Sequence, residues 1–282
     1  MTDPPFYRIG PERPVLPVIL SVPHAGRAYP PALVEAARVP LSVLETLEDR
    51  LVDRLIWRAV ATGATAFVAT LPRASIDLNR DEREVDPAMV APPPPAHALL
   101  PSARTRGGLG LVPARLAGAG ALWRGRISRE ELNRRVETVH RPFHSALDSA
   151  LTAARQRFGA AILLDCHSMP PRPQGEAKVI FGDRHGRTLA PALLEAALAA
   201  TRSLGFSASC NEPYAGGHVI ERHGRPGAQT HALQIEVDRS TYLDPTLRDP
   251  GPGFDSVARL IAAVVDALNE AITAPPSAIA AE

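Results

Sequence analysis

Two histidines at the ends of short apolar segments are the best-placed metal ligands in this sequence. His24 follows residues 18–22, and His167 follows residues 162–166. Ligands of open α/β sheets bind at the carboxyl ends of the strands. Imidazole is a good zinc ligand, and catalytic zinc takes three protein ligands plus water. One histidine at a strand end is more often structural, but two at matching positions favour a shared metal.

A carboxylate is expected to complete such a site, and two aspartates are candidates. Asp49 and Asp53 lie in residues 41–62, where leucines recur at helical spacing. They are four residues apart and would share one face of a helix. Each is followed by an arginine, so a solvated ion pair is the alternative for both. We favour Asp49, which is nearer the helix start, and keep Asp53 as the alternative ligand.

A cationic segment follows the apolar residues 64–70. It contains Arg73, Asn79 and Arg80. The planar guanidinium group of arginine matches a carboxylate with two parallel hydrogen bonds. This segment therefore suits an anionic substrate, although a charged surface loop fits the pattern equally well.

Glu236 is the acid best placed to act as a general base. It lies in residues 231–237, which otherwise read as a buried strand. A buried carboxylate is costly unless it is paired or functional. Beside a metal it would accept a proton from water, and the alternative is a buried ion pair with Arg239 or Arg222.

Two further patterns favour a structural role. His140 and His144 have the spacing of a zinc-binding helix, but no glutamate follows His140, and Pro142 intervenes. Cys166 adjoins His167, yet a cysteine inside a strand is more often simply buried.

Composition narrows the class of protein. The chain has 282 residues, 45% of them apolar, and a net charge of +1. This balance does not favour nucleic acid or an anionic membrane as a partner. No apolar run is long enough to span a membrane, and the N-terminus does not resemble a signal peptide. The two cysteines form no disulfide framework or metal motif, so we expect a cytoplasmic protein.

Strands alternate with helices along the chain, which predicts an α/β fold with a largely parallel sheet and helices on both faces. Residues 71–127 read as a long loop, which is usually functional or a lid. Ser128 and Glu131 form a capping box at the start of a helix. We expect strands at 15–22, 64–70, 160–165, 178–182, 205–209 and 231–237, and helices at 41–62, 128–157, 188–203 and 253–273.

Together these motifs resemble the N-formylglutamate amidohydrolase family, from about residue 15 to 270. Each motif alone is weak, but their order is fairly specific. They are Ser21-Val-Pro-His24-Ala-Gly26, Asp49-Arg-Leu-Val-Asp53-Arg-Leu, Arg73-x-x-x-Asp77-Leu-Asn79-Arg80, Asp165-Cys-His167-Ser-Met-Pro, Gly216-Gly217-x-x-x-x-Arg222-His-Gly224 and Gln234-Ile-Glu236.

The resemblance implies a fold similar to zinc carboxypeptidases: one three-layer αβα catalytic domain over residues 1–282, with a mixed, mainly parallel sheet. Related zinc enzymes carry a glutamate ligand three residues after the first histidine. This chain has Arg27 there, so we expect the carboxylate ligand to be Asp49. The implied roles are zinc binding by His24, Asp49 and His167, oxyanion binding by Arg73, carboxylate binding by Asn79 and Arg80, and general base for Glu236. Arg222 and His218 are our candidates for the rest of the substrate.

The implied activity is metal-dependent hydrolysis of N-formyl-L-glutamate to formate and L-glutamate, as in histidine catabolism. Zinc suits the ligand set, although iron, cobalt or manganese would also bind it. The alternatives are a zinc amidohydrolase or carboxypeptidase for another N-acyl amino acid or peptide, a cysteine hydrolase using Cys166, and a non-catalytic binding protein. We expect a small-molecule substrate, and the sequence does not indicate an oligomeric state.

Overall fold

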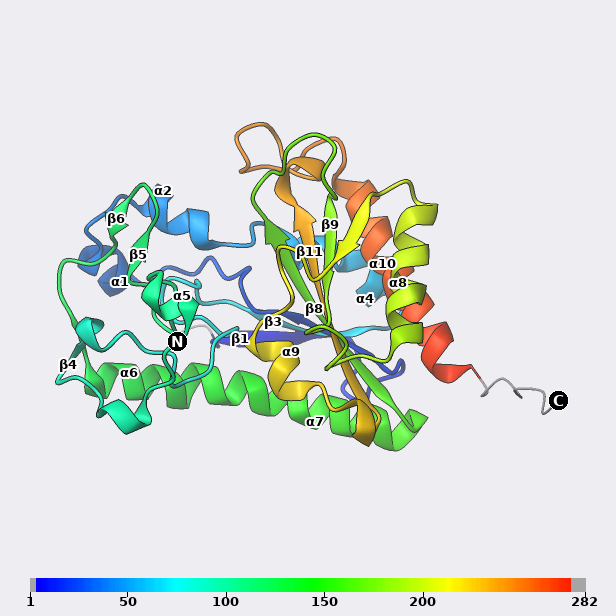
Figure 1. The fold of residues 1–282 in the computed structure, drawn as a ribbon, viewed down its shortest axis with the longest axis horizontal. Coiled ribbons are helices and arrows are strands. Elements are labelled where there is room, and N and C mark those ends of the chain that lie inside the picture. The colour runs from blue at the N-terminus through cyan, green and yellow to red at the C-terminus, as the bar shows by residue number, and fades with distance from the viewer. Residues whose placement is uncertain (1–3, 275–282) are drawn as a thin grey trace.

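The protein is built around a seven-stranded mixed sheet (Figure 1). A computed structural model describes residues 4–274. The remaining residues of the expected 1–282 domain, 1–3 and 275–282, lie outside that range. The strands in spatial order are β1 (Phe6–Ile9), β3 (Thr65–Ala69), β2 (Val18–Val22), β8 (Ala161–Met169), β11 (Thr230–Asp238), β9 (Val179–Gly182) and β10 (Ala208–Cys210).

The sheet is mainly parallel, as the sequence predicts. Strands β3, β2, β8 and β11 run parallel to their neighbours in this series. Strand β1 pairs antiparallel with β3 at one edge, and β9 pairs antiparallel with β11 before β10 continues parallel to β9. The sequence analysis missed β1, and it placed the strand at 205–209 a few residues too early.

Helices cover both faces of the sheet (Figure 1). Because side chains alternate along a strand, Leu20 joins the core on one face and Ile19 the core on the other. The first core includes residues of α3 (Val52–Leu55), α4 (Trp57–Ala61), α8 (Pro191–Ser203) and α10 (Phe254–Thr273). The second includes residues of α6 (Arg129–Arg135), α7 (Arg141–Phe158) and α9 (His218–His223).

The expected helix at 41–62 is wrong, because the segment is broken. It forms α2 (Leu41–Leu44), a 3-10 turn (Glu45–Leu47), α3 and α4. Leu51 has a φ of 62°, a conformation that interrupts a right-handed helix. Asp49 lies in this break and its backbone N–H donates to the carbonyl oxygen of His24 at 2.9 Å. Asp49 and Asp53 therefore do not share one helical face.

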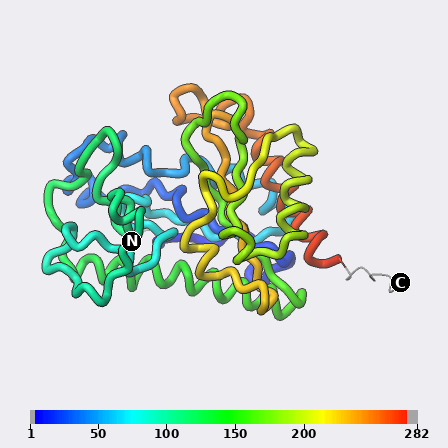
Figure 2. The backbone as a smooth tube through the Cα atoms, in the orientation of Figure 1, coloured from blue at the N-terminus to red at the C-terminus, as the bar shows by residue number. Residues whose placement is uncertain are grey.

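Residues 71–127, expected as a long loop, contain several short elements. Their backbone folds back on itself repeatedly (Figure 2). With α1 (Pro31–Ala36) and α2 they lie in the part of the molecule at the left of Figure 1. A small apolar cluster that includes Leu44, Ala74 and Leu122 packs within it. A role for this segment as a lid stays a prediction. Its short elements are β4 (Val90–Ala91), α5 (Ala103–Arg106), β5 (Arg115–Leu116), β6 (Gly120–Ala121) and β7 (Ile127–Ser128), with 3-10 turns at Pro87–Met89 and Ala96–Ala98.

The long helix expected at 128–157 is present but contains a π-helical turn. Ser128 caps it, because its Oγ accepts a hydrogen bond from the Glu131 N–H at 3.0 Å. Helices α6 and α7 are joined by the π-helical turn Val136–His140. Among the described residues, no helix is both long and apolar enough to cross a membrane.

Candidate active site

Three buried side chains meet at the carboxyl end of the sheet. His24 follows β2, His167 lies near the end of β8, and Asp49 lies in the break before α3. Their exposed fractions are 2%, 3% and 2%, and one ligand atom from each lies within 4.8 Å of the others. The Oδ2 atom of Asp49 is 3.3 Å from Nδ1 of His24 and 2.8 Å from Nδ1 of His167. Oδ2 of Asp49 therefore contacts one nitrogen of each histidine.

The other nitrogen of each histidine is held by a second carboxylate. Nε2 of His24 donates to Asp77 at 2.7 Å, and Nε2 of His167 donates to Asp165 at 2.8 Å. A carboxylate only accepts, so each Nε2 carries a hydrogen and Nδ1 is the atom available to a metal. This carboxylate–histidine arrangement is typical of metal sites, where it fixes the ring and raises its basicity.

The charges of the cluster also suit a cation. Burial alone would raise the pKa of Asp49, but hydrogen bonds from His167 and His24 hold it well below its ordinary value. Burial alone would lower the pKa of His167, but Asp165 and Asp49 raise it well above the ordinary range. A proton therefore bridges His167 and Asp49, and a divalent metal binds by displacing such a proton. Two imidazoles and one carboxylate fit Zn²⁺.

The second carboxylate oxygen of Asp49, Oδ1, is held by two other side chains. Oδ1 lies 3.2 Å from both Nη2 of Arg239 and Oγ of Ser168. Arg239 also donates to Ser168 at 3.0 Å. This leaves Oδ2 of Asp49 directed at the two histidines.

Asp53, the alternative ligand, is engaged elsewhere. Both terminal nitrogens of Arg27 donate to its carboxylate, at 2.9 and 2.7 Å. Arg27 occupies the position at which related zinc enzymes carry a glutamate, and here it binds an acid instead. The structure brings Asp49, and not Asp53, to the histidines.

Glu236 lies beside this cluster. In the parallel pairing of β11 with β8 it is opposite His167. It is 9% exposed, and Nε2 of Gln234 donates to its Oε1 at 2.9 Å. Among the described residues it forms no ion pair, because Arg239 binds Asp49. Burial, the main cause, raises the pKa of Glu236 to about 7, which suits a general base at neutral pH.

Arg73 reaches the cluster through Asp77. Its Nε donates to Oδ2 of Asp77 at 2.8 Å, while Oδ1 of the same carboxylate accepts from His24. No described residue accepts a hydrogen bond from the terminal nitrogens of Arg73. They are the donors that this side chain offers to a bound molecule.

The amide of Asn79 is engaged by the protein itself. Its Oδ1 accepts from the Val219 N–H at 2.8 Å, and its Nδ2 lies 3.2 Å from Nε2 of His167 and 3.4 Å from Oε1 of Gln234. A Cβ on Gly217 would lie 2.4 Å from this amide. Asn79 therefore ties the start of α9 to the cluster.

The other residues expected to bind substrate are Arg80, His218 and Arg222, and they lie in different environments. Arg80 is buried and donates to the carbonyl oxygens of Leu109 and Asn79, at 2.9 and 2.6 Å. His218 begins α9. Arg222 is exposed and borders a surface pocket with Asp148 and Arg155 that contains none of the residues above.

A thiol mechanism through Cys166 is not supported. The side chain of Cys166 is fully buried and belongs to the first apolar core, on the face of β8 opposite His167. Burial raises the pKa of its thiol well above the ordinary value. Both features make the thiolate inaccessible.

Four supporting residues were not predicted from the sequence, although part of the signal was present. Asp165 is two residues before His167, and Gln234 is two residues before Glu236, so each pair shares one face of a strand. Asp77 lies within the cationic segment. Nothing in the sequence indicated Arg239 as a partner of Asp49.

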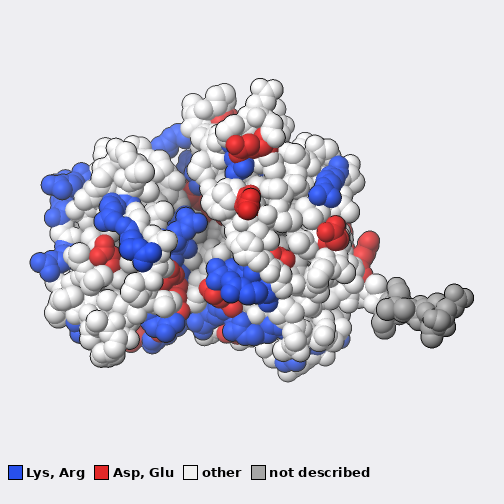
Figure 3. All heavy atoms as spheres, viewed as in Figure 1, with Lys and Arg blue, Asp and Glu red and all other residues white. Residues whose placement is uncertain are grey.

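The molecular surface is hollowed between the part formed by residues 71–127 and the sheet (Figure 3). Lysine and arginine side chains border both sides of this hollow in the view shown. A separate cavity of about 1000 Å³, lined by residues such as Tyr29, Trp123 and Arg135, contains none of His24, Asp49 and His167.

Comparisons with known proteins agree on one family. The family described as N-formylglutamate amidohydrolase matches residues 16–243. An N-formylglutamate deformylase of Pseudomonas putida is 31% identical over 92% of this chain and 93% of its own, and one of Pseudomonas aeruginosa is 31% identical over 81% and 83%. The crystal structure of N-formylglutamate amidohydrolase from Ralstonia eutropha JMP134 has a TM-score of 0.85 and 34% identity, covering 93% and 95% of the two chains. The chain therefore belongs to the N-formylglutamate amidohydrolase family.

Proposed function

We propose that this protein hydrolyses N-formyl-L-glutamate to formate and L-glutamate in a metal-dependent reaction. The names of its relatives in two Pseudomonas species support the substrate. One structural observation carries the metal dependence: the Nδ1 atoms of His24 and His167 converge on Asp49 while each Nε2 is held by another carboxylate. Such an arrangement is typical of a metal centre.

In this proposal His24, Asp49 and His167 hold one divalent cation, with Zn²⁺ as the expected metal. When bound, the cation polarises the formyl carbonyl group and makes water a better nucleophile. Asp77 and Asp165 hold the two imidazole rings in the orientation that directs Nδ1 to the cation.

Glu236 moves the proton. Its carboxylate accepts a proton as water attacks the formyl carbon, and it then delivers the proton to the nitrogen of glutamate as the C–N bond breaks. Gln234 holds one oxygen of Glu236 and leaves the other for this transfer. Arg73 donates to the developing oxyanion, a contact worth about 10²–10³ in rate in enzymes of this general type.

Substrate carboxylates bind to cations at the same edge of the sheet. We propose Arg80 for the α-carboxylate. A substrate contact by His218 stays a prediction, which its position beside His140 and His144 does not favour. Because both ends of the Asn79 amide bond protein groups, we propose that Asn79 positions His167 and α9 and does not bind substrate. A contact between Arg222 and the side-chain carboxylate stays a prediction, which its exposed position does not favour.

The test is release of the free amino acid by the purified protein loaded with Zn²⁺, measured with N-formyl-L-glutamate, N-formyl-L-aspartate, N-acetyl-L-glutamate and a peptide with C-terminal glutamate. We expect the highest kcat/KM with N-formyl-L-glutamate and no turnover after chelation. A preference for another substrate would replace the proposed one. Full turnover in the chelated protein would overturn the metal dependence.

A further inference from the structure

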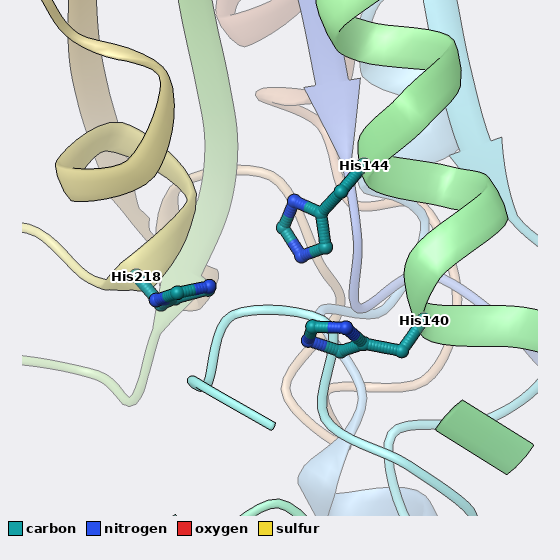
Figure 4. Close-up of side chains that lie close together, drawn as sticks. All are labelled: His140, His144 and His218. Carbon is teal, nitrogen blue, oxygen red and sulfur yellow. The ribbon is translucent and has the colours of Figure 1, made fainter. Parts of the chain in front are cut away.

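Three histidines meet on the far side of the segment that carries Asp77, Asn79 and Arg80 (Figure 4). His140 ends the π-helical turn, His144 lies one turn further along α7, and His218 reaches them from the start of α9. One nitrogen from each lies within 4.8 Å of the others. By spacing alone this would be a second metal site.

His144 argues against a metal there, because both of its ring nitrogens already have partners in the protein. Nε2 of His140 donates to the carbonyl oxygen of Arg80 at 2.8 Å, and Nε2 of His144 donates to that of Leu78 at 3.0 Å. A carbonyl oxygen only accepts, so both Nε2 atoms carry hydrogens. The two rings thus hold the backbone on either side of Asn79.

The tautomer of His144 is set by a third ring. Its Nδ1 lies 2.9 Å from Nε2 of His223, and Nδ1 of His223 lies 2.7 Å from Oδ1 of Asp148. Burial lowers the pKa of His144 well below its ordinary value, so its ring is neutral and Nδ1 accepts. Nε2 of His223 therefore donates to His144, and Nδ1 of His223 lies against the carboxylate of Asp148, whose side chain is 58% exposed.

Residues 77–80, the segment held by His140 and His144, carry three groups of the candidate active site. Asp77 holds His24, Asn79 contacts His167 and Arg80 follows directly. The buried polar atoms of this segment are therefore bonded on one side to the metal-site histidines and on the other to α7. A shift of the backbone at residue 78 or 80 would move these groups together.

The helix is distorted where it carries His140, which supports a specific role for this histidine. Pro142 has no N–H to donate and would crowd the preceding turn of a regular helix. The π-helical turn Val136–His140 directly precedes α7, and the Arg141 N–H bonds to the carbonyl oxygen of Val136. Such single π turns occur frequently at functional sites.

We propose that His140 and His144 are positioning residues, which align Asp77, Asn79 and Arg80 by binding the carbonyl groups of Leu78 and Arg80. His223 keeps His144 in the tautomer that this requires. The inference rests on the proposed function for its catalytic consequence, but the geometry it describes is measurable without substrate.

The first test compares His144→Leu and His144→Gln, with His231→Leu as the matched control. His231 is a buried histidine at the opposite end of β11 and touches no part of the held segment. We expect His144→Leu to weaken Zn²⁺ binding about tenfold, as loss of supporting contacts does at metal sites, and to lower kcat more than it raises KM. The amide of His144→Gln retains a donor and should restore part of both, whereas His231→Leu should keep wild-type values. Wild-type Zn²⁺ affinity in a folded His144→Leu would overturn the proposal.

The second test uses the wild-type protein, so it does not depend on whether a variant of a buried residue folds. In ¹⁵N spectra of the wild-type protein, we expect His144 to be protonated at Nε2 only, and Nε2 of His223 to carry the proton that it shares with Nδ1 of His144. A His144 ring protonated at Nδ1 only, or Zn²⁺ binding directly to His140 and His144, would contradict the proposed arrangement. A wild-type protein that binds Zn²⁺ but releases no formate would refute the proposed function. The ¹⁵N measurement would still test the hydrogen bonds of His144, because it requires no turnover.

Discussion

Glu236 lies directly across from His167 on the neighbouring parallel strand, and their side chains share one face of the sheet. Gln234 and Asp165 are paired in the same way two residues earlier. Neighbouring strands are about 4.8 Å apart, so the sheet itself sets the spacing between the proposed base and a proposed metal ligand. A site built on strands is more rigid than one built on loops.

Glu236→Gln should separate metal binding from turnover. The amide keeps the size of the side chain but cannot accept the proton, so we expect kcat to fall by about 10²–10⁴. Metal content, measured by elemental analysis, should equal that of wild type. Glu35→Gln, at an exposed position on α1, is the control and should leave both unchanged. Loss of metal in Glu236→Gln would instead make Glu236 a ligand.

The pH dependence of kcat/KM should report the same carboxylate. Burial raises the pKa of Glu236 to about 7, and the base acts only when deprotonated. Activity should therefore be lost as the pH falls through this value, about tenfold per unit below it. A bound dication favours the carboxylate form, so the acid limb of the metal-loaded enzyme should lie at or below 7. An acid limb that persists in Glu236→Gln would assign it to another group.

Asp49→Asn and Asp53→Asn form a matched pair that tests the third ligand. Loss of the Asp49 carboxylate should weaken metal binding by more than about 100-fold, since even supporting residues at metal sites are worth 10–100-fold. Asp53→Asn should bind metal as wild type does and lose only the ion pair to Arg27, which costs about 1 kcal/mol of stability. Titration with a competing chelator and thermal unfolding measure the two effects, and the reverse order of affinities would exchange the roles of the two aspartates.

The sequence predicts the fold class and the strand-end histidines because both depend on local patterns. An apolar run followed by a histidine is visible in one short segment, and alternation of strands with helices indicates a largely parallel sheet. The position of Glu236 is predictable for the same reason, since an acid in an apolar strand stands out.

The surroundings of Asp49 were less predictable because they depend on tertiary contacts. Leu51 adopts a positive φ, which a leucine rarely does and which no glycine or proline marks in the sequence. The break it creates lets the backbone of Asp49 bind His24, and Arg239 reaches Asp49 from a distant part of the chain. Periodicity of leucines in residues 41–62 therefore predicted one helix where the fold requires several.

The carboxylates behind the histidines should contribute to metal affinity. Asp77→Asn and Asp165→Asn remove the negative charge that holds Nε2 of His24 and His167. We expect each to weaken Zn²⁺ binding by about 10–100-fold. Asp183→Asn is the control, because Asp183 is also buried but bonds to Gly186 and Asn211 instead. Equal affinities in all three variants would argue against a supporting role for Asp77 and Asp165.

Gly217→Ala should disturb the site through Asn79. A Cβ at Gly217 would lie 2.4 Å from the Asn79 amide, closer than any stable contact, so Asn79 or the start of α9 must move. Because Asn79 contacts His167 and bonds Val219, we expect weaker Zn²⁺ binding and a lower kcat. Gly227→Ala is the matched control, since a Cβ there meets no atom within 4 Å. Chelator competition and formate release on both variants distinguish the cases, and a Gly217→Ala protein that matches Gly227→Ala in both would show that the packing of Asn79 against α9 is not needed for the site.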